Sequence, residues 1–244
     1  MARTADSQPT TAAGVPALVP HGRFKGKPAM PLGRPVTIVG ARNRSHLHLV
    51  SPSVSKSHAM IVNAGGGFYV RDLASRTHVH VNGQRVREAE LREGDILGVG
   101  AFTFRFTDGA GGPARRPAAA PVPAVLRIGG RNLPHPIVGR SMLIGRRPTC
   151  DLALEELDVS TTHAVIFQMS GKWFLRDLGS RTGTFVNGTA VHQQPLELGD
   201  HVKVGELEMT LVAASEAGAA GLEELEDLAG TAPLAGDEPL DLIF

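Results

Sequence analysis

The sequence contains the same pattern twice, at a constant offset of 105 residues (163 − 58 and 188 − 83). The shared segments of the first copy are Val54-Ser55, His58-Ala59, Arg71-Asp72-Leu73, Ser75-Arg76-Thr77, Val81-Asn82-Gly83, Gly94-Asp95 and Gly100. Those of the second copy are Val159-Ser160, His163-Ala164, Arg176-Asp177-Leu178, Ser180-Arg181-Thr182, Val186-Asn187-Gly188, Gly199-Asp200 and Gly205. A repeat of this length is a domain rather than a unit of a solenoid. We therefore expect two related domains in tandem, each of roughly 90 to 100 residues.

Changes in composition set the expected boundaries of these domains. The predicted segments are a disordered N-terminus (1–17), a first domain (18–108), a linker (109–123), a second domain (124–213) and an acidic disordered tail (214–244). The linker is rich in Gly, Ala and Pro, which is typical of a flexible segment with a stiffer proline-rich end. After Ser215 the tail has acidic residues and no basic ones, so it is either a solvated tail or a docking motif for a partner.

The pattern inside each copy is that of short β-strands. Aromatic and aliphatic runs such as Phe68-Tyr69-Val70 and Trp173-Phe174-Leu175 follow glycine-containing turns. Phe102–Phe106 alternates with a period of two, which indicates a half-buried strand. Turn residues recur every 8 to 12 residues or so, as in an antiparallel sandwich. The predicted fold is all-β, with two tandem antiparallel β-sandwiches.

Composition excludes several classes of function. Hydrophobic residues make up 42% of the chain and the net charge is +1, which gives no reason to expect nucleic acid or a membrane as a partner. The chain has no run of 18 apolar residues, so we expect no membrane span. The single cysteine, Cys150, excludes an internal disulfide, and we expect a cytoplasmic protein.

Polar residues of the second copy fall in predicted loops. They combine guanidinium groups, hydroxyls and turn glycines without a cluster of carboxylates, which is the chemistry that binds an oxyanion. The loops that carry these residues are Gly145-Arg146, Ser160-Thr161-Thr162-His163 and Ser180-Arg181-Thr182-Gly183-Thr184. We expect no metal, no cofactor and no catalytic residue.

The second copy resembles the forkhead-associated (FHA) domain over nearly all of residues 124–213. The motifs that carry the resemblance are Gly145-Arg146, Cys150-Asp151-Leu152, Val159-Ser160-x-x-His163-Ala164, Asp177-Leu178-Gly179-Ser180-x-x-Gly183-Thr184-x-Val186-Asn187-Gly188 and Leu198-Gly199-Asp200. The first copy aligns to the second without gaps, so residues 20–107 are similar to the same family. The resemblance implies sandwiches of about eleven strands that bind phosphothreonine peptides through loops at one end.

The resemblance also implies a role for each candidate residue. Arg146 would pair with the phosphate, Ser160 and Thr161 would donate hydrogen bonds to it, and Arg181 and Thr182 would line the far side of the pocket. The chain departs from the family where Thr161 replaces Arg or Asn, and where Thr182 replaces Asn. Structural roles, rather than metal binding, would fall on His58, His163, Asn82 and Asn187.

The first copy departs further from the family. Ala41 stands where the phosphate arginine is expected, and His78 stands where the second copy has Gly183. Because glycine tolerates positive φ freely, we expect His78 to reshape its loop. The residues of a possible second site are Arg42, Ser55, Lys56, Arg76 and Thr77. This copy either binds phosphothreonine more weakly or is a structural or phosphate-independent copy.

These observations favour a non-catalytic adaptor in Ser/Thr-kinase signalling, with the second domain as the principal reader. Its expected partners are phosphothreonine-containing proteins, which are a Ser/Thr kinase or its substrates. A phosphate-independent scaffold is the alternative. A hydrolase triad of Ser160, His163 and Asp177 is also conceivable, but a nucleophile and its base are recognised by geometry rather than by spacing.

Overall fold

The structure is a computed structural model that describes residues 14–65, 67–109, 122–129 and 134–216. Its elements are strands, apart from two short 3₁₀ helices, η1 (Gly22–Phe24) and η2 (Ala214–Glu216). The predicted all-β class is therefore confirmed. The disorder that we predicted for the N-terminus, the linker and the acidic tail falls mainly on residues 1–13, 110–121 and 217–244, which lie outside the described residues. No helix in the described parts of the chain is long and apolar enough to cross a membrane.

Each domain has eleven described strands. Those of the first domain are β1 (Ala17–Pro20), β2 (Met30–Pro31), β3 (Val36–Gly40), β4 (Leu47–His48), β5 (Ala59–Asn63), β6 (Phe68–Asp72), β7 (Val79–Val81), β8 (Gln84–Val86), β9 (Glu88–Leu91), β10 (Ile96–Val99) and β11 (Phe102–Thr107). Those of the second are β12 (Ala124–Ile128), β13 (His135–Pro136), β14 (Ser141–Gly145), β15 (Leu152–Ala153), β16 (Ala164–Met169), β17 (Lys172–Asp177), β18 (Thr184–Val186), β19 (Thr189–Val191), β20 (Gln193–Leu196), β21 (His201–Val204) and β22 (Leu207–Ala213).

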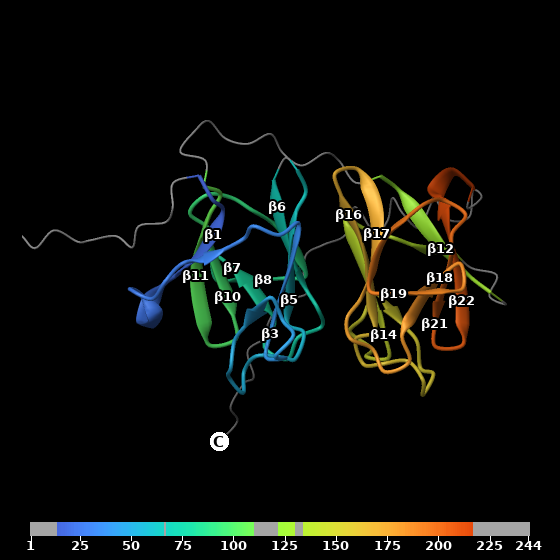
Figure 1. The fold of residues 1–244 in the computed structure, drawn as a ribbon, viewed down its shortest axis with the longest axis horizontal. Helices are drawn as coiled ribbons and strands as arrows, with labels where there is room; N and C mark the ends of the chain where they lie inside the picture. Colours follow the sequence, from blue (N-terminus) through green and yellow to red (C-terminus); the bar gives the residue numbers. More distant parts are fainter. Residues whose placement is uncertain (1–13, 66, 110–121, 130–133, 217–244) are drawn as a thin grey trace, which may run out of the picture.

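Each domain is a sandwich of one six-stranded and one five-stranded sheet (Figure 1). The strand orders in the first domain are β2-β1-β11-β10-β7-β8 and β4-β3-β5-β6-β9. In the second domain they are β13-β12-β22-β21-β18-β19 and β15-β14-β16-β17-β20. The pairing is antiparallel except for β3 with β4 and β14 with β15, which are parallel. The two domains therefore have the same topology, as the ungapped repeat requires.

A separate hydrophobic core fills each sandwich. Leu18, Ile61 and Phe104 lie in the core of the first domain, and Leu126 and Ile166 lie in that of the second. The alternating strand that we predicted over Phe102–Phe106 buries Phe104 and Phe106 and exposes Arg105. Apolar residues at every second position thus build one face of the six-stranded sheet.

A third cluster of buried apolar residues joins the two domains. It consists of Val36, Ile38, Met60, Val62, Tyr69, Leu73, Ala74, Leu143, Cys150, Val165, Phe167 and Leu178. These residues lie on the outer faces of the two five-stranded sheets, which stand opposite each other in the centre of Figure 1. Strands β5 and β16 are therefore covered on both faces, and their sequences are continuous apolar runs rather than alternating ones.

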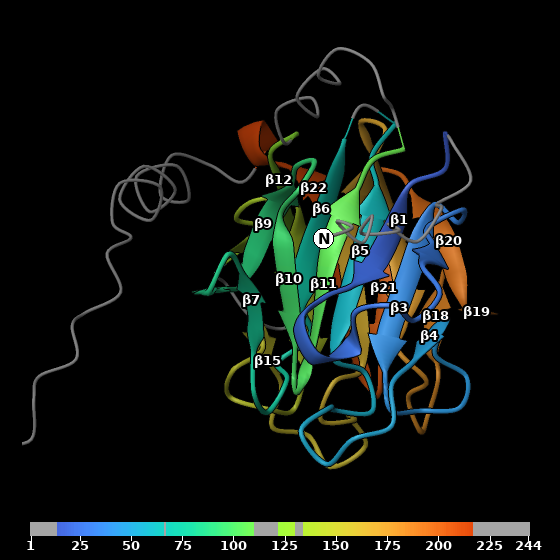
Figure 2. The same ribbon diagram turned by 90° about the vertical axis from the view of Figure 1, so that its left-hand side faces the viewer.

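Hydrogen bonds across this interface follow the internal repeat. Arg42 donates from Nη1 to the carbonyl oxygen of Gly179 at 3.1 Å, and Arg147, at the same position in the second copy, donates to that of Ala74. The Tyr69 hydroxyl donates to the carbonyl of Gln168 at 2.8 Å. The domains are thus docked against each other, with equivalent surfaces in contact. When the molecule is seen from the side of the first domain, the two sandwiches lie one behind the other (Figure 2).

Candidate functional site

The candidate residues of the second domain lie on three loops that follow β14, β15 and β17. These loops gather at the lower end of the molecule in Figure 1, beside the corresponding loops of the first domain. The reciprocal contacts of Arg42 and Arg147 tie the two groups of loops together. Both candidate sites therefore open at the same end of the docked pair.

Backbone and side-chain contacts bring Arg146, Ser160 and Arg181 together. The Arg146 amide donates to the Ser160 carbonyl at 2.9 Å, and its Nε donates to the Val159 carbonyl at 3.3 Å. The Ser160 hydroxyl accepts from the Arg181 amide at 3.0 Å. The Arg146 side chain is exposed, so its guanidinium remains within reach of a ligand.

Thr182 and Thr161 complete this group of residues. The Thr182 hydroxyl donates to the Asp158 carbonyl at 3.0 Å, and Arg181 donates from Nη2 to the Leu157 carbonyl at 2.7 Å. Thr161 is exposed, and its carbonyl accepts from the Arg147 amide at 3.2 Å. Arg146, Arg181 and Thr182 are thus all bonded to the loop of residues 157–160, which also carries Ser160, and Thr161 follows this loop directly.

His163 is fully buried beneath these loops. Its Nδ1 accepts from the Ser160 amide at 3.1 Å, and its Nε2 lies 3.0 Å from the Gly183 carbonyl. Both ring nitrogens are thus engaged by backbone groups, and neither is hydrogen-bonded to the Ser160 hydroxyl. The ring ties two loops together in a position where it is not placed to take a proton from that hydroxyl.

Asp177 organises the turn that carries Arg181 and Thr182. One carboxylate oxygen accepts from the Ser180 amide at 3.0 Å, and the other accepts from the Thr184 hydroxyl at 2.8 Å. Burial alone would raise the pKa of Asp177, but these hydrogen bonds outweigh burial and hold the pKa below its usual value. The carboxylate is therefore a charged brace for the turn.

The loops of the first domain have the same framework. The Ser55 hydroxyl accepts from the Arg76 amide at 2.9 Å, and the Ser55 amide donates to His58 Nδ1 at 3.1 Å. Thr77 donates its hydroxyl to the Ser53 carbonyl at 2.8 Å. Each of these contacts has a counterpart in the second domain.

Our expectation that His78 reshapes its loop is wrong. His78 adopts φ 58°, and Gly183 at the same position adopts φ 83°. The carbonyls of both residues lie within hydrogen-bonding distance of the histidine beneath, at 3.2 Å for His78 with His58. Histidine enters the left-handed region more readily than most residues, so the framework imposes the same turn on it.

The first domain differs from the second in charge rather than in backbone. Ala41 has no guanidinium, and Arg42, the next residue, is directed at the Leu178 carbonyl of the other domain at 2.8 Å. Lys56 is exposed near the loop and supplies a point charge. The structure thus brings Ser55, Arg76 and Thr77 together but turns Arg42 toward the interface.

The two asparagines occupy equivalent turns away from the loops. Asn82 and Asn187 have φ 53° and 49°, and each donates from its amide to an aspartate, Asp95 or Asp200, at 2.8 Å. Each also accepts a backbone amide at 2.9 Å. These contacts close the turn after β7 and the turn after β18. Within the described ranges, no three His, Cys, Asp or Glu side chains are grouped as a metal ion would require.

Comparison with known families agrees with this architecture. A family model for the FHA domain matches residues 33–100 and 142–205, one segment in each sandwich. The two segments together make up more than half of the chain, so the chain belongs to the FHA domain family.

Each of two curated relatives matches a stretch of this chain about as long as one domain. The transcriptional regulatory protein EmbR of Mycobacterium tuberculosis is 35% identical over 82 residues, which are 33% of this chain and 21% of EmbR. The oxoglutarate dehydrogenase inhibitor of Corynebacterium efficiens is 33% identical over 73 residues, which are 30% of this chain and 51% of the inhibitor. The matches therefore span about half or less of these relatives.

Two solved structures also match part of the chain. EmbR of Mycobacterium tuberculosis in complex with a low affinity phosphopeptide is 31% identical, with a TM-score of 0.37, and the match covers 43% of this chain and 28% of EmbR. The FHA domain of FhaA, complexed with the intracellular domain of Rv3910, is 28% identical, with a TM-score of 0.33, over 36% of this chain and 98% of that domain.

Sequence reasoning missed the residues that hold the domains together. Arg71 pairs with Asp151 of the other domain, and Arg147 was not singled out at all. The sequence feature that could have indicated this interface is the mostly apolar character of strands β3, β5, β14 and β16, which is typical of sheets that are covered on both faces.

Proposed function

We propose that the chain is a non-catalytic adaptor of Ser/Thr-kinase signalling that binds phosphothreonine peptides, with the second domain as the principal reader. The observation that carries the proposal is the exposed Arg146 guanidinium beside the Ser160 hydroxyl, on loops held in place by His163. Family membership supports the same function. The expected partners are a kinase or its substrates, and the cytoplasmic location stays a prediction.

The chemistry of the second site matches a phosphate ester. A phosphorylated threonine carries about −1.5 to −2 charges at neutral pH and presents three acceptor oxygens. Arg146 offers a forked donor for two of them, and Thr161, exposed beside it, offers a hydroxyl and a backbone amide. Arg181 and Thr182 lie across the surface, where they would contact the peptide main chain.

Docking of the domains adds a second aspect to this proposal. Because both sets of loops open at the same end, a doubly phosphorylated or dimeric partner would reach two sites that are already oriented. Such an arrangement raises the effective concentration for the second contact without depending on a linker to span the sites.

The alternative function is a scaffold that binds proteins without phosphate. Calorimetry on the full chain distinguishes the two, with one peptide prepared in three forms that carry phosphothreonine, phosphoserine or threonine. We expect binding of the phosphothreonine form and none of the threonine form at the same concentration. Equal binding of the phosphorylated and unmodified forms would favour the scaffold.

A further inference from the structure

Two pockets flank the domain interface at positions that the internal repeat relates to each other. The first pocket includes Arg71, Arg87 and Asp151, and the second includes Arg176 and His192, which are the counterparts of the two arginines. The counterpart of Asp151 in the second pocket is His46, which also lines it. The two pockets thus share three pairs of equivalent lining positions, and the first pocket has two carboxylates, Asp151 and Glu88, whose counterparts are His46 and Gln193.

The carboxylate balances the charge of the first pocket. Asp151 pairs with Arg71 and lies 3.3 Å from Arg87 Nη1. It also accepts from the Leu143 amide at 2.6 Å. One carboxylate of the protein thus contacts two guanidinium groups and a backbone amide, although the Nε of Arg71 itself has no hydrogen-bond partner among the described residues.

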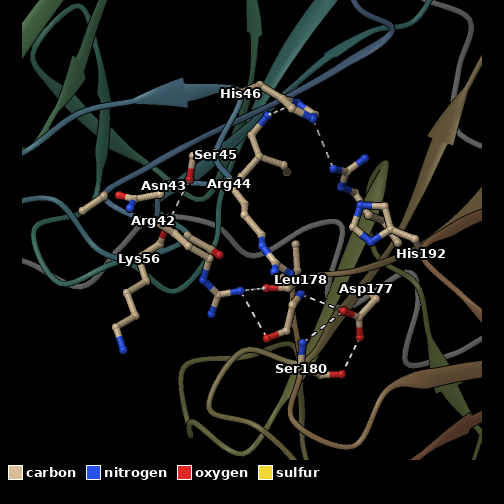
Figure 3. Close-up of a pocket in the computed structure, with 15 residues that line it drawn as sticks. Arg42, Asn43, Arg44, Ser45, His46, Lys56, Asp177, Leu178, Ser180 and His192 are labelled. Carbon is tan, nitrogen blue, oxygen red and sulfur yellow. Dashed lines mark hydrogen bonds between the residues drawn. The ribbon is translucent and has the colours of Figure 1, made fainter.

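In the second pocket His46 cannot replace this carboxylate. The Ile38 amide, the counterpart of the Leu143 amide, donates to His46 Nδ1 at 3.1 Å. A neutral imidazole that accepts at Nδ1 carries its proton on Nε2. This Nε2 lies 3.5 Å from Arg176 Nη2, so two donors face each other (Figure 3). An acceptor oxygen between them would satisfy both.

Arg176 is a buried charge without a carboxylate of its own. It is 8% exposed, and within the part of the chain that the structure describes its Nε has no hydrogen-bond partner, a feature that it shares with Arg71 in the first pocket. Its Nη1 donates to Gln193 Oε1 at 2.6 Å, where the first domain has Glu88. Burial lowers the pKa of Arg176 and nearby Arg34 lowers it further, whereas Asp177 raises it. Asp177 is itself held by the hydroxyls of the turn that follows it.

The cavity around Arg176 is large and basic. Its volume is about 930 Å³, within the range of small-molecule sites. Its charged lining residues are Arg42, Arg44, Lys56, Arg176 and a single carboxylate, Asp177. Figure 3 shows Arg42 and Arg44 on one side of the cavity and Asp177 and His192 on the other. Arg176 is buried at its base while Arg44 and Lys56 are exposed around it, and such a concentration of positive charge attracts an anion.

We propose that this inter-domain pocket binds an oxyanion, carboxylate or phosphate, with one oxygen placed between Arg176 Nη2 and His46 Nε2, as the Asp151 carboxylate is placed in the first pocket. The site is separate from the surface around Arg146, and it shares only Arg42 and Lys56 with the candidate residues of the first-domain loops. The anion is supplied either by a free small molecule or by the C-terminal segment 217–244, which has acidic side chains and no basic ones.

The test is a thermal melt of the chain carrying Arg146→Ala, titrated with inorganic phosphate and with citrate. The Arg146→Ala background removes the anion response expected from the loop site of the second domain, and any response of the first-domain loops is common to the two variants compared below. His46→Asp, added to this background, supplies the missing carboxylate from the protein. His48→Asp is the matched control, because it makes the same change of charge two residues away, outside the pocket lining.

We expect phosphate or citrate to raise the melting temperature of the background chain. His46→Asp should raise it without added anion and weaken the apparent affinity for the anion by about tenfold or more. His48→Asp should respond as the background does. If segment 217–244 is the occupant, the response should be small in the full chain and appear in a chain that ends at residue 216. If the occupant is a free anion, both lengths should respond equally.

Two results would overturn the proposal. One is the absence of stabilisation by phosphate and citrate in both lengths of chain. The other is an anion response of His46→Asp that equals the response of His48→Asp. Neither result depends on whether the loops around Arg146 bind phosphothreonine.

Discussion

The two loop sites have nearly the same backbone and different charges. In each domain a buried histidine accepts the amide of the loop serine, and the serine hydroxyl accepts the amide of an arginine two strands later. The second domain adds the Arg146 guanidinium to this framework, whereas the first has Ala41. The comparison shows that the loop framework forms with or without a guanidinium group at this position.

The turn at His78 extends this lesson. A histidine occupies a left-handed conformation there because the surrounding hydrogen bonds fix the turn, at a cost of order 1 kcal/mol or more. The first domain therefore has nearly the same loop backbone as the second, with different side chains on it. The following predictions change one domain toward the other, or remove what they share.

Arg146→Ala has the largest expected effect. Loss of one partner of a desolvated charge pair costs about 2 to 5 kcal/mol, so calorimetry should detect little or no binding of a phosphothreonine peptide to the second domain. Lys172→Ala is the control, because it also removes one positive charge but lies at the opposite end of β17. Unchanged affinity of Arg146→Ala, or an equal loss in Lys172→Ala, would contradict the role of Arg146.

His163→Ala and His58→Ala should both lower the free energy of unfolding. Each change leaves a loop amide and a buried carbonyl without their partner, at about 1 to 3 kcal/mol per group. Denaturant unfolding measures the loss. Phosphopeptide affinity should fall only in His163→Ala, and an equal fall in His58→Ala would show that the first site contributes as much as the second.

Ala41→Arg should improve the first site. The new guanidinium would stand where the second domain has Arg146. In a chain that also carries Arg146→Ala, we expect Ala41→Arg to raise the calorimetric affinity for a phosphothreonine peptide by about tenfold, or 1.4 kcal/mol. The full chain is the right material, because separated domains would expose the apolar interface. If Ala41→Arg gives no gain, the two frameworks are less alike than their hydrogen bonds indicate.

Cys150 should report opening of the interface. It is 5% exposed in the inter-domain cluster, and burial raises the pKa of its thiol to about 11. Reaction with a thiol reagent at neutral pH should therefore be slow in the native chain and faster in Phe167→Ala, which leaves a cavity in the interface. Equal rates in the two chains would show that the domains separate readily.

The sequence predicted the fold class and the repeat, and it pointed to Arg146, Ser160 and Arg181, which the structure brings together on the loops of the second domain. It did so because strand alternation, turn residues and loop motifs are local patterns. The docking of the domains was not predicted. Apolar runs such as residues 59–62 show that both faces of a strand are covered, but they do not show which part of the protein covers them. The direction of Arg42 was missed for the same reason, since its acceptor lies 136 residues away along the chain.

The most direct test of the central claim is an NMR titration of the unaltered full chain with one phosphothreonine peptide, followed at backbone amides. The amides of Thr161, Arg181 and Gly183 report on the second site, and those of Lys56 and Arg76 report on the first. We predict that the second set saturates at about tenfold lower peptide concentration than the first. Saturation of the Lys56 and Arg76 amides at the lower concentration would contradict the assignment of the second domain as the principal reader.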